Sequence, residues 1–425
     1  MMKFGVLSFL VPPSASGMTM VLYHLLKGFS GENYCLISEH DYSKPDPDHD
    51  YTALLPANYH YLPMDTVISR GARWRLPQRF GYAYIPLGIA SRARHIAEIL
   101  RRERCDALLA CTGGWDCLNM PAGYLSCRLL NIPYYAYIFD YYSKQWEGPN
   151  YWGHGDYAWM GRLFEKKLLR GAAGVIAPNE FLCSALQERY GIEPVVIHNP
   201  CDLSRYELVY HEEVPGADRE IRIVYTGDIY DAHFDAFANL LEAIKRTGRD
   251  NLKLHAYVIR SQEYLRNHGV SGPQLVLHAH APHDTIPEIQ RRADILFLAL
   301  AFHPPYPEAI KTAAPGKIGE YLASGRPILV HAPADSFTAW YFREHECGLL
   351  VDTDDPQALA LGIEQLLTDE ALRRRLVVNA FARARGDFSV DATREKFARF
   401  LKWNREETRD FVTASSEQAG VSGPG

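Results

Sequence analysis

Short apolar segments alternate with amphipathic ones along almost the whole chain, and this alternation restricts the possible folds most. Residues 106–111 and 132–139 are apolar and short, as buried strands are. The helical period of residues 181–191 ends at Gly191, a residue that commonly stops helices. Repeated strand and helix segments predict an α/β fold in which parallel sheets are covered by helices.

The alternation runs twice, and the break between the two runs predicts two domains. Residues 200–220 are charged, contain proline and glycine, and have no apolar period, so they are the best candidate for a connection. A strand at 221–227 and a helix with an apolar stripe then restart the pattern. Two doubly wound, Rossmann-like domains in tandem are expected to face a common cleft with the carboxyl ends of their strands.

The domain boundaries follow from the same pattern. We predict a first domain at 1–202, a second at 203–390, a C-terminal helix within 391–410 that returns to the first domain, and a disordered tail at 411–425.

Composition excludes several classes of protein. With 425 residues, a net charge of -6 and 47% hydrophobic residues, the chain is not a disordered one and gives no global argument for nucleic-acid binding. The eight cysteines show no metal-binding or redox spacing, and reduced thiols of a cytoplasmic protein are the simplest interpretation. The apolar run at the N-terminus is too short to span a membrane.

Residues 311–330 carry the strongest chemical signal. Pro315 suits the first position of a helix and Gly325 its end, which puts Lys317 in the first turn, at the positive end of the helix dipole. A cation there is disfavoured unless an anion lies opposite. Glu320 shares the face of Lys317, so together they could hold a phosphate and a pair of ribose hydroxyls. An ordinary helix with a surface lysine and glutamate is the alternative.

A second signal lies near the N-terminus, where residues 12–26 combine proline, serine and glycine ahead of an apolar helix. The backbone is bare at Gly17 and free amides begin the helix, so a ligand can approach closely. No GxGxxG follows the first strand, which excludes the usual dinucleotide fingerprint. A plain turn between strand and helix is the alternative.

Residues 311–330 resemble the donor-binding signature of glycosyltransferase family 4, whose members are retaining, use nucleotide sugars and have the two-domain GT-B fold. The resemblance implies that Glu320 binds the donor ribose and that residues 275–300 contain the loop that lines the nucleotide base. The donor-binding residues that it implies or that the local pattern suggests are Gly17, Gly227, Arg260, His280, Ala281, Pro282, Gly316, Lys317, Ile318 and Glu320.

The sequence departs from the family at three positions, one of which is Phe139, where a His or Arg is expected before Asp140. The family commonly has a second glutamate where this chain has Thr312, and Glu308 is the candidate to replace it. Asp228 stands where an arginine is expected, and an acid beside a diphosphate is repulsive. The charge must then be balanced by Lys317, Lys311 or Arg260, of which Lys317 is favoured.

The resemblance also implies a mechanism without a protein nucleophile or a metal, in which the departing phosphate accepts the proton of the acceptor hydroxyl. Asp140, at the carboxyl end of a strand, is the candidate for orienting hydroxyls, and a helix cap or a buried, hydrogen-bonded acid is the alternative. The catalytic candidates are therefore Asp140, Lys317 and Glu308.

The acceptor side is less specific. Residues 134–159 are dense in tyrosine and tryptophan, which either pack on sugars or lipids or fill the core. Tyr141, Trp146 and His154 are the candidate acceptor contacts. The Arg-rich residues 69–80 suggest a peripheral contact with an anionic membrane, with a solvated surface as the alternative.

These observations predict a cytoplasmic glycosyltransferase that moves a sugar from a nucleotide diphosphate sugar to a glycan, a lipid-linked or a small-molecule hydroxyl acceptor. A GT-B epimerase or phosphorylase is one alternative. A catalytically degenerate nucleotide-sugar-binding subunit is another, and Asp228 and Thr312 are its support.

Overall fold

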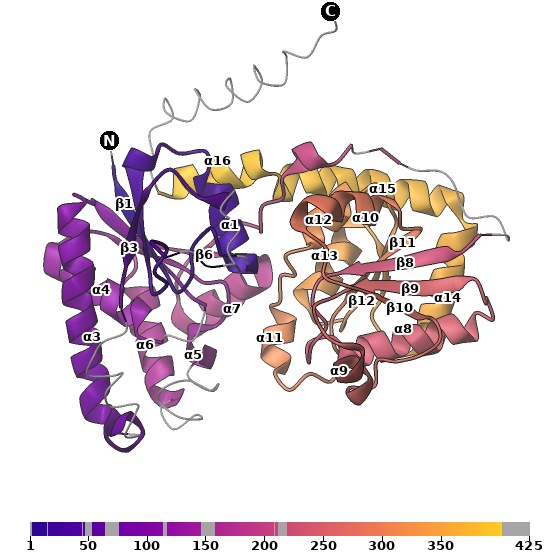
Figure 1. Ribbon diagram of the computed structural model, residues 1–425, viewed down its shortest axis with the longest axis horizontal. Coiled ribbons are helices and arrows are strands. Elements are labelled where there is room, and N and C mark those ends of the chain that lie inside the picture. Colours follow the sequence, from indigo (N-terminus) through magenta and orange to yellow (C-terminus); the bar gives the residue numbers. More distant parts are fainter. Residues whose placement is uncertain are drawn as a thin grey trace, which may run out of the picture. The chain divides into compact units, whose positions relative to one another are not determined.

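The computed structural model describes residues 2–14, 16–44, 46, 53–63, 76–113, 117–145, 158–207, 209–210 and 219–401. The chain divides into two compact units, Met1–His198 with Thr393–Gly425, and Asn199–Ala392. Each unit contains a parallel sheet with helices on both faces, as Figure 1 shows. The predicted fold class, two doubly wound α/β domains, is confirmed. No helix in the described part of the chain has the length and apolarity that a membrane span requires.

The described sheet of the first unit has the strand order β3-β2-β1-β4-β5-β6-β7, and its neighbouring strands are parallel. Successive side chains of β1 enter different cores, because Leu7 packs on one face of the sheet while Phe4 and Val6 pack on the other. The strands are β1 (Phe4–Ser8), β2 (Tyr34–Ser38), β3 (Asn58–Tyr61), β4 (Ala107–Cys111), β5 (Tyr134–Tyr137), β6 (Gly174–Ala177) and β7 (Val195–Val196).

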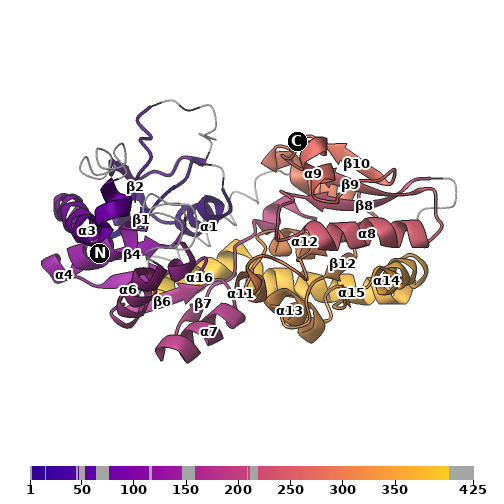
Figure 2. The ribbon, with the colours of Figure 1, turned by 90° about the horizontal axis from the view of Figure 1, so that it is seen from below.

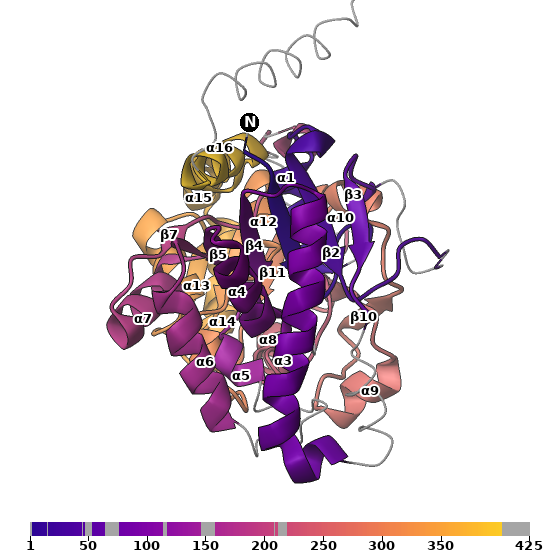
Figure 3. The ribbon, with the colours of Figure 1, turned by 90° about the vertical axis from the view of Figure 1, so that its left-hand side faces the viewer.

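Helices cover both faces of this sheet. The described helices of the unit are α1 (Gly17–Leu26), α3 (Leu76–Arg102), α4 (Asn119–Leu130), α5 (Tyr142–Gln145), α6 (Ala158–Arg170), α7 (Glu180–Tyr190) and α16 (Val390–Phe400), with a short 3-10 helix η1 (Gly31–Asn33). A second short 3-10 helix, η3 (Leu203–Arg205), follows at the start of the second unit. The long helix α3 packs along α4, as seen in Figure 3. As predicted, Gly191 ends α7, in the left-handed conformation at φ 63°.

The C-terminal helix α16 packs on the first unit. The ring of Phe397 lies 6.5 Å from that of Phe4 and 6.3 Å from that of Phe29. Arg394 Nη2 donates a hydrogen bond of 2.7 Å to the carbonyl of His24. In Figure 1 this yellow helix accordingly lies with the indigo start of the chain. The tail predicted at 411–425 lies outside the described residues.

The described sheet of the second unit has the order β10-β9-β8-β11-β12-β13, again parallel. Its strands are β8 (Ile221–Thr226), β9 (Leu252–Tyr257), β10 (Leu275–His278), β11 (Ile295–Ala299), β12 (Ile328–His331) and β13 (Leu349–Val351). The order reverses between β8 and β11, and ligands of open parallel sheets bind at the carboxyl ends of strands beside such a reversal.

The described helices of the second unit are α8 (Phe234–Arg246), α9 (Gln262–Asn267), α10 (Ile286–Arg291), α11 (Pro307–Lys311), α12 (Ile318–Ala323), α13 (Phe337–His345), α14 (Pro356–Thr368) and α15 (Glu370–Arg383), with a short 3-10 helix η4 (His283–Thr285) and a π-helical segment η5 (Ala384–Phe388). The predicted stripe of α8 is buried through Phe237, Leu240 and Ile244. α8 lies beside α14 on one face of the sheet, as Figure 2 shows.

The division between the units lies before the connection predicted from the sequence. Cys201 already pairs with the end of the second unit, because its N–H donates to the carbonyl of Phe388 at 2.6 Å and its carbonyl accepts from Val390 at 3.2 Å. The start and end of the second unit are therefore joined by backbone hydrogen bonds.

Candidate functional site

Lys317 lies just before α12 and not inside a helix, so the sequence-based placement is wrong in this detail. The N–H of Ile318 donates to the carbonyl of Pro315 at 3.1 Å, which closes a turn ahead of the helix. α12 then has six residues, and Gly325 follows its end at φ 76°. So short a helix gives little dipole, and the environment of Lys317 has to come from other elements.

That environment is the aromatic ring of Tyr225 on β8. Lys317 Nζ lies 3.8 Å from the ring centre and donates a hydrogen bond of 2.6 Å to Tyr225 Oη. Tyr225 is fully buried and its hydroxyl donates to the carbonyl of Asp228 at 2.7 Å. Gly227 leaves the room for the lysine, since a Cβ atom there would stand 2.9 Å from Nζ and its φ is 125°.

The partly buried site destabilises the charged form of Lys317 relative to the neutral amine. Burial lowers the pKa of Lys317 to about 7, although the carboxylates of Glu320 and Asp228 oppose the shift. The pKa of the neighbouring His233 is lowered to about 3, mainly by burial and also by the charge of Lys317. Lys317 is thus a cation that an additional anion would stabilise.

Glu320 presents a carboxylate with one oxygen fixed. Its Oε2 accepts a hydrogen bond of 3.1 Å from Gln290 Nε2, whereas Oε1 accepts none from the described residues. Gln290 is held in turn, because its Oε1 accepts from Tyr206 Oη at 3.1 Å. Burial raises the pKa of Glu320, against the opposing effects of Gln290, Lys317 and Arg205. The free oxygen is a hydrogen-bond acceptor for a ligand.

Asp228, the acid at the position where an arginine was expected, is paired with Arg260. Arg260 Nη2 lies 2.9 Å from Asp228 Oδ2, and the two residues come from the loops after β9 and β8. The negative charge that counted against a diphosphate site is therefore compensated inside the unit.

The other predicted donor residues of the second unit lie at the start of α12 and in the connection from β10 to α10. None of them makes a described hydrogen bond to Lys317, Glu320 or Asp228. Gly316 is exposed in the turn before Lys317, and Ile318 is buried as the first residue of α12. In the connection from β10 to α10, Ala281 is buried while His280 and Pro282 are exposed. This connection offers backbone groups and little side-chain chemistry.

Glu308 is not grouped with Lys317. It is exposed on α11, where its charge raises the pKa of Lys311 as a minor contribution beside the ion pair of Lys311 with Asp335. The charges that act on Lys317 are those of Glu320 and Asp228. The structure gives no support to Glu308 as the replacement for the glutamate missing at Thr312.

In the first unit, Gly17 and Asp140 lie in connections that follow strands of one sheet. Gly17 begins α1 after the cap Ser16, is exposed, and has no atom within 4 Å of the position of a Cβ. Asp140 is exposed three residues after β5, and its N–H donates to Thr112 Oγ1 at 3.3 Å. Both residues are accessible to a ligand of this unit.

Of the three predicted acceptor contacts, the structure describes Tyr141 alone. The side chain of Tyr141 is 5% exposed and the guanidinium of Arg189 lies 5.0 Å from its ring centre, which favours a packing role over contact with an acceptor. Trp146 and His154 lie outside the described residues. Of the Arg-rich residues 69–80, those up to 75 are also outside, and the others begin α3.

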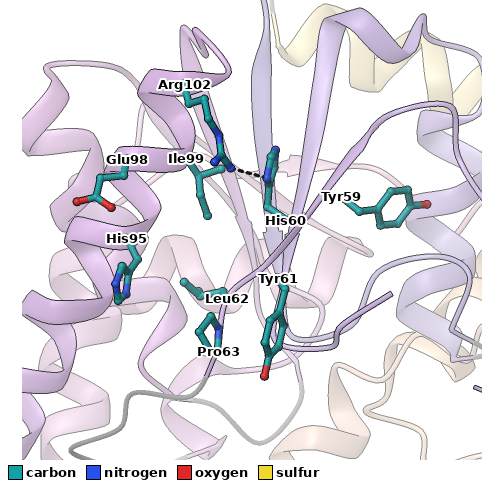
Figure 4. A pocket seen from close by; sticks show the side chains of 9 residues that line it. All are labelled: Tyr59, His60, Tyr61, Leu62, Pro63, His95, Glu98, Ile99 and Arg102. Atoms are coloured by element: carbon teal, nitrogen blue, oxygen red, sulfur yellow. Dashed lines mark hydrogen bonds between the residues drawn. The ribbon is translucent and has the colours of Figure 1, made fainter. Parts of the chain in front are cut away.

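A separate pocket of about 390 Å³ lies in the first unit, between the edge strand β3 and α3. Figure 4 shows Arg102 directed at His60, to which its Nη2 donates a hydrogen bond of 3.0 Å. None of the predicted site residues is among its described lining. Within the described residues, no group of three or more His, Cys, Asp or Glu is arranged to hold a metal ion.

Two groups in the second unit were not anticipated from the sequence. Tyr225 and Gln290 belong to a strand and a helix whose local patterns give no sign of a site. Their partners Lys317 and Glu320 are 92 and 30 residues away, and only the fold brings these pairs together.

Comparison with known proteins identifies the family. Residues 16–205 match Glycosyltransferase Family 4, and residues 220–369 match Glycosyl transferases group 1. The lipopolysaccharide core biosynthesis glycosyltransferase LpsE of Rhizobium meliloti (strain 1021) is 32% identical over 82 residues. That match spans 19% of this chain and only 24% of the length of LpsE.

Solved structures share the fold over nearly the whole chain. Sucrose-phosphate synthase from Thermosynechococcus elongatus is 14% identical, with 95% of this chain and 98% of that chain covered at a TM-score of 0.66. Anabaena HepE, solved in complex with UDP and glucose, is 15% identical, with 95% and 100% covered at a TM-score of 0.65.

These matches confirm the resemblance seen in the sequence and favour a transferase over an epimerase, a phosphorylase or a degenerate subunit. The chain belongs to glycosyltransferase family 4 and is a glycosyltransferase of the two-domain GT-B fold.

Proposed function

We propose that this enzyme transfers a sugar from a nucleotide diphosphate sugar to a hydroxyl acceptor, with retention of the anomeric configuration. The observation that carries the proposal is the pairing of Lys317 and Glu320 on one short segment, a partly buried cation beside a carboxylate whose Oε1 accepts no hydrogen bond from the described residues. The complexes of Anabaena HepE with UDP and glucose and with UDP-glucose support the same class of donor.

Glu320 binds the ribose in this proposal. Two neighbouring ribose hydroxyls are donors that match a carboxylate acceptor, and Oε1 has no competing hydrogen bond from the described residues. Gln290 fixes the other oxygen, so the carboxylate does not have to reorganise when the nucleotide binds.

Lys317 stabilises the departing diphosphate. The bond between the anomeric carbon and the diphosphate oxygen breaks, and negative charge grows on that oxygen as it leaves. A fixed ammonium group in a partly buried site stabilises this growing charge more than it stabilises the bound donor before the bond breaks, which is the requirement for catalysis.

The acceptor oxygen forms the new bond to the anomeric carbon on the face that the diphosphate leaves, and its proton passes to the departing phosphate oxygen. Asp140 orients hydroxyl groups of the sugar or acceptor in this scheme, from an exposed position after β5. The scheme requires no metal ion, so activity is expected to persist in excess EDTA. Retention predicts a product with the donor's anomeric configuration, which NMR of the newly formed linkage measures.

The acceptor is a glycan, a lipid-linked or a small-molecule hydroxyl, and we place the enzyme in the cytoplasm. An anionic membrane contacts the Arg-rich residues 69–80 in this proposal. Co-flotation with vesicles containing anionic lipid, but not with neutral vesicles, is the expected result. Equal recovery with both kinds of vesicle would contradict the membrane contact.

The donor site is tested by thermal shift of the purified protein with UDP, GDP, ADP, CDP and dTDP. A ligand that binds only the folded protein raises its melting temperature, so one diphosphate is expected to give a selective shift. Glu320→Gln removes the charge that the ribose hydroxyls bind, and we expect about tenfold or greater loss of affinity. Glu242→Gln on the exposed face of α8 is the matched control and should bind as the wild type does.

Wild-type affinity in the Glu320→Gln variant would contradict the assignment of the ribose site. No shift of the wild-type protein with any of the five diphosphates would overturn the proposed donor class as a whole.

A further inference from the structure

We infer that Arg260 is the second cation of the diphosphate site and at the same time cancels the charge of Asp228. The inference rests on the proposed function, because it concerns the same donor. It adds a residue from the loop after β9 to a proposed site whose other residues lie on β8, on α10, just before α12 and on α12.

Arg260 is held on two sides. Its Nε lies 3.1 Å from Asp228 Oδ1 and 3.0 Å from Oδ2, and its Nη2 lies 2.9 Å from Oδ2. The ring of Tyr264 on α9 lies 4.9 Å from the guanidinium carbon. Two such constraints fix the plane of the guanidinium group and reduce the entropy lost when it binds a ligand.

Asp228 is itself fixed to the core. Its Oδ1 accepts a hydrogen bond of 3.0 Å from the N–H of Ile229, a fully buried residue. Its carbonyl accepts from Tyr225, which in turn accepts from Lys317. A continuous series of contacts therefore links Arg260 to Lys317 through Asp228 and Tyr225.

The outer edge of Arg260 remains available. Nη1 makes no hydrogen bond to any described residue, and the side chain is 40% exposed. Donors on that edge point away from the carboxylate that holds the other edge, and guanidinium groups bind phosphate oxygens in this way. Lys317 and Arg260 balance the carboxylates of Asp228 and Glu320, so without Arg260 the diphosphate would meet a net negative site.

An ordinary surface ion pair is the competing explanation, and a second ion pair of the same unit provides the control. Arg249 binds Glu364 with Nε at 2.6 Å and Nη2 at 2.8 Å, and the two side chains are 38% and 34% exposed. Arg249 precedes β9 whereas Arg260 follows it, so the two pairs lie at opposite ends of the same strand. Arg249→Ala matches Arg260→Ala in chemistry and differs in location.

The experiment measures binding of UDP, GDP and ADP, each beside its nucleoside, by calorimetry on the full-length protein. We expect Arg260→Ala to weaken diphosphate binding about tenfold or more and to leave nucleoside binding unchanged, because only the diphosphate contacts Arg260. Arg249→Ala should bind both ligands as the wild type does. Arg260→Lys keeps the positive charge but cannot make a bidentate contact, so its diphosphate affinity should lie between those of the wild type and Arg260→Ala.

The double variant Arg260→Ala/Asp228→Asn distinguishes an electrostatic role of Arg260 from a purely structural one. In Arg260→Ala the carboxylate of Asp228 is left uncompensated beside the diphosphate, so adding Asp228→Asn should recover part of the lost affinity. A simple structural role predicts no such recovery. Equal diphosphate affinity in wild type and Arg260→Ala, or a double variant that binds no more tightly than Arg260→Ala, would overturn the inference while the donor site itself stands. A wild-type protein that binds none of the diphosphates would instead overturn the proposed function.

Discussion

At the scale of single residues, the charge state of Lys317 depends on what lies beside it. The ammonium group touches the face and hydroxyl of Tyr225, and burial brings its pKa down to about 7. A diphosphate beside it favours the charged form and therefore raises the pKa of Lys317 in the complex. Binding of the donor should then take up a proton near neutral pH.

The sign of the pH dependence follows from this shift. Below the free-state pKa of about 7, Lys317 is already charged and the affinity is highest. As the pH rises above 7, protonation has to accompany binding, and the affinity falls by up to about tenfold per pH unit until the pKa of the complex is reached. Calorimetry with a nucleoside diphosphate at pH 6, 7, 8 and 9 measures how the affinity depends on pH. The terminal phosphate of the ligand has a pKa of roughly 6, so its own charge changes little above pH 7.

Two variants isolate the contribution of Lys317 from those of Glu320, Asp228, Tyr225 and His233, which face it. Lys317→Met removes the titrating group, and Lys317→Arg keeps a charge that does not titrate in this range. Both should bind with a flatter pH profile than the wild type. A wild-type profile in either variant would assign the pH dependence to another group.

At the scale of elements, a buried ion pair ties α3 to the end of β2 and the start of α4. Arg92 is 2% exposed and pairs with Glu39, while its Nε donates to Asn119 Oδ1 at 2.8 Å. Asn119 Nδ2 also donates to Glu39 Oε1 at 3.0 Å. Removing one partner of such a pair takes away the opposite charge that compensates the desolvation of the other.

We expect Arg92→Met to destabilise the first unit by about 3 kcal/mol, measured as a shift of its unfolding transition in urea. Replacing both charges in Arg92→Met/Glu39→Met should restore much of the loss, since an apolar pair of similar volume avoids the desolvation cost. Arg343→Met, which breaks the exposed pair with Asp352, should cost less than about 1 kcal/mol. A loss in the double variant as large as that in Arg92→Met would contradict the ion-pair explanation.

The elements also show how far the sequence predicted the structure. Buried strands such as β4 and β11 are continuous apolar runs, and the stripe of α8 has a clear helical period, so these elements were predictable. Neither β2 nor β3 was predicted from the sequence. The residues of β3, Asn-Tyr-His-Tyr, are polar or aromatic and partly exposed at the edge of the sheet, where no apolar run is needed.

The candidate site was predictable where its residues are close in sequence. Lys317 and Glu320 were found from their spacing and the turn chemistry around them. The pair of Asp228 with Arg260 was not, because 32 residues separate them and their meeting depends on β8 and β9 lying side by side. The turn that begins at Pro315 was mistaken for the first turn of a helix because proline suits both.

At the scale of the whole molecule, each unit has a core of its own. The apolar cluster of the second unit contains no residue of the first, and the two clusters beside the first sheet contain none of the second. The first unit is completed by α16, whose Phe397 is fully buried. Unfolding of the full chain is therefore expected in more than one step, and a single free energy of unfolding does not describe it.

The second unit should fold when it is excised as residues 199–392. Its ends are joined by the backbone hydrogen bonds between Cys201 and the residues Phe388 and Val390, so excision leaves them tied together. Lys317, Tyr225 and Glu320 all lie within this segment. We expect a cooperative unfolding transition and an affinity for nucleoside diphosphate close to that of the full chain, without sugar transfer, because Asp140 and the rest of the first unit are missing. Calorimetry on the segment measures this affinity, with the Glu320→Gln variant of the segment as the control for specific binding. A folded segment that binds no diphosphate would show that the first unit contributes directly to the donor site.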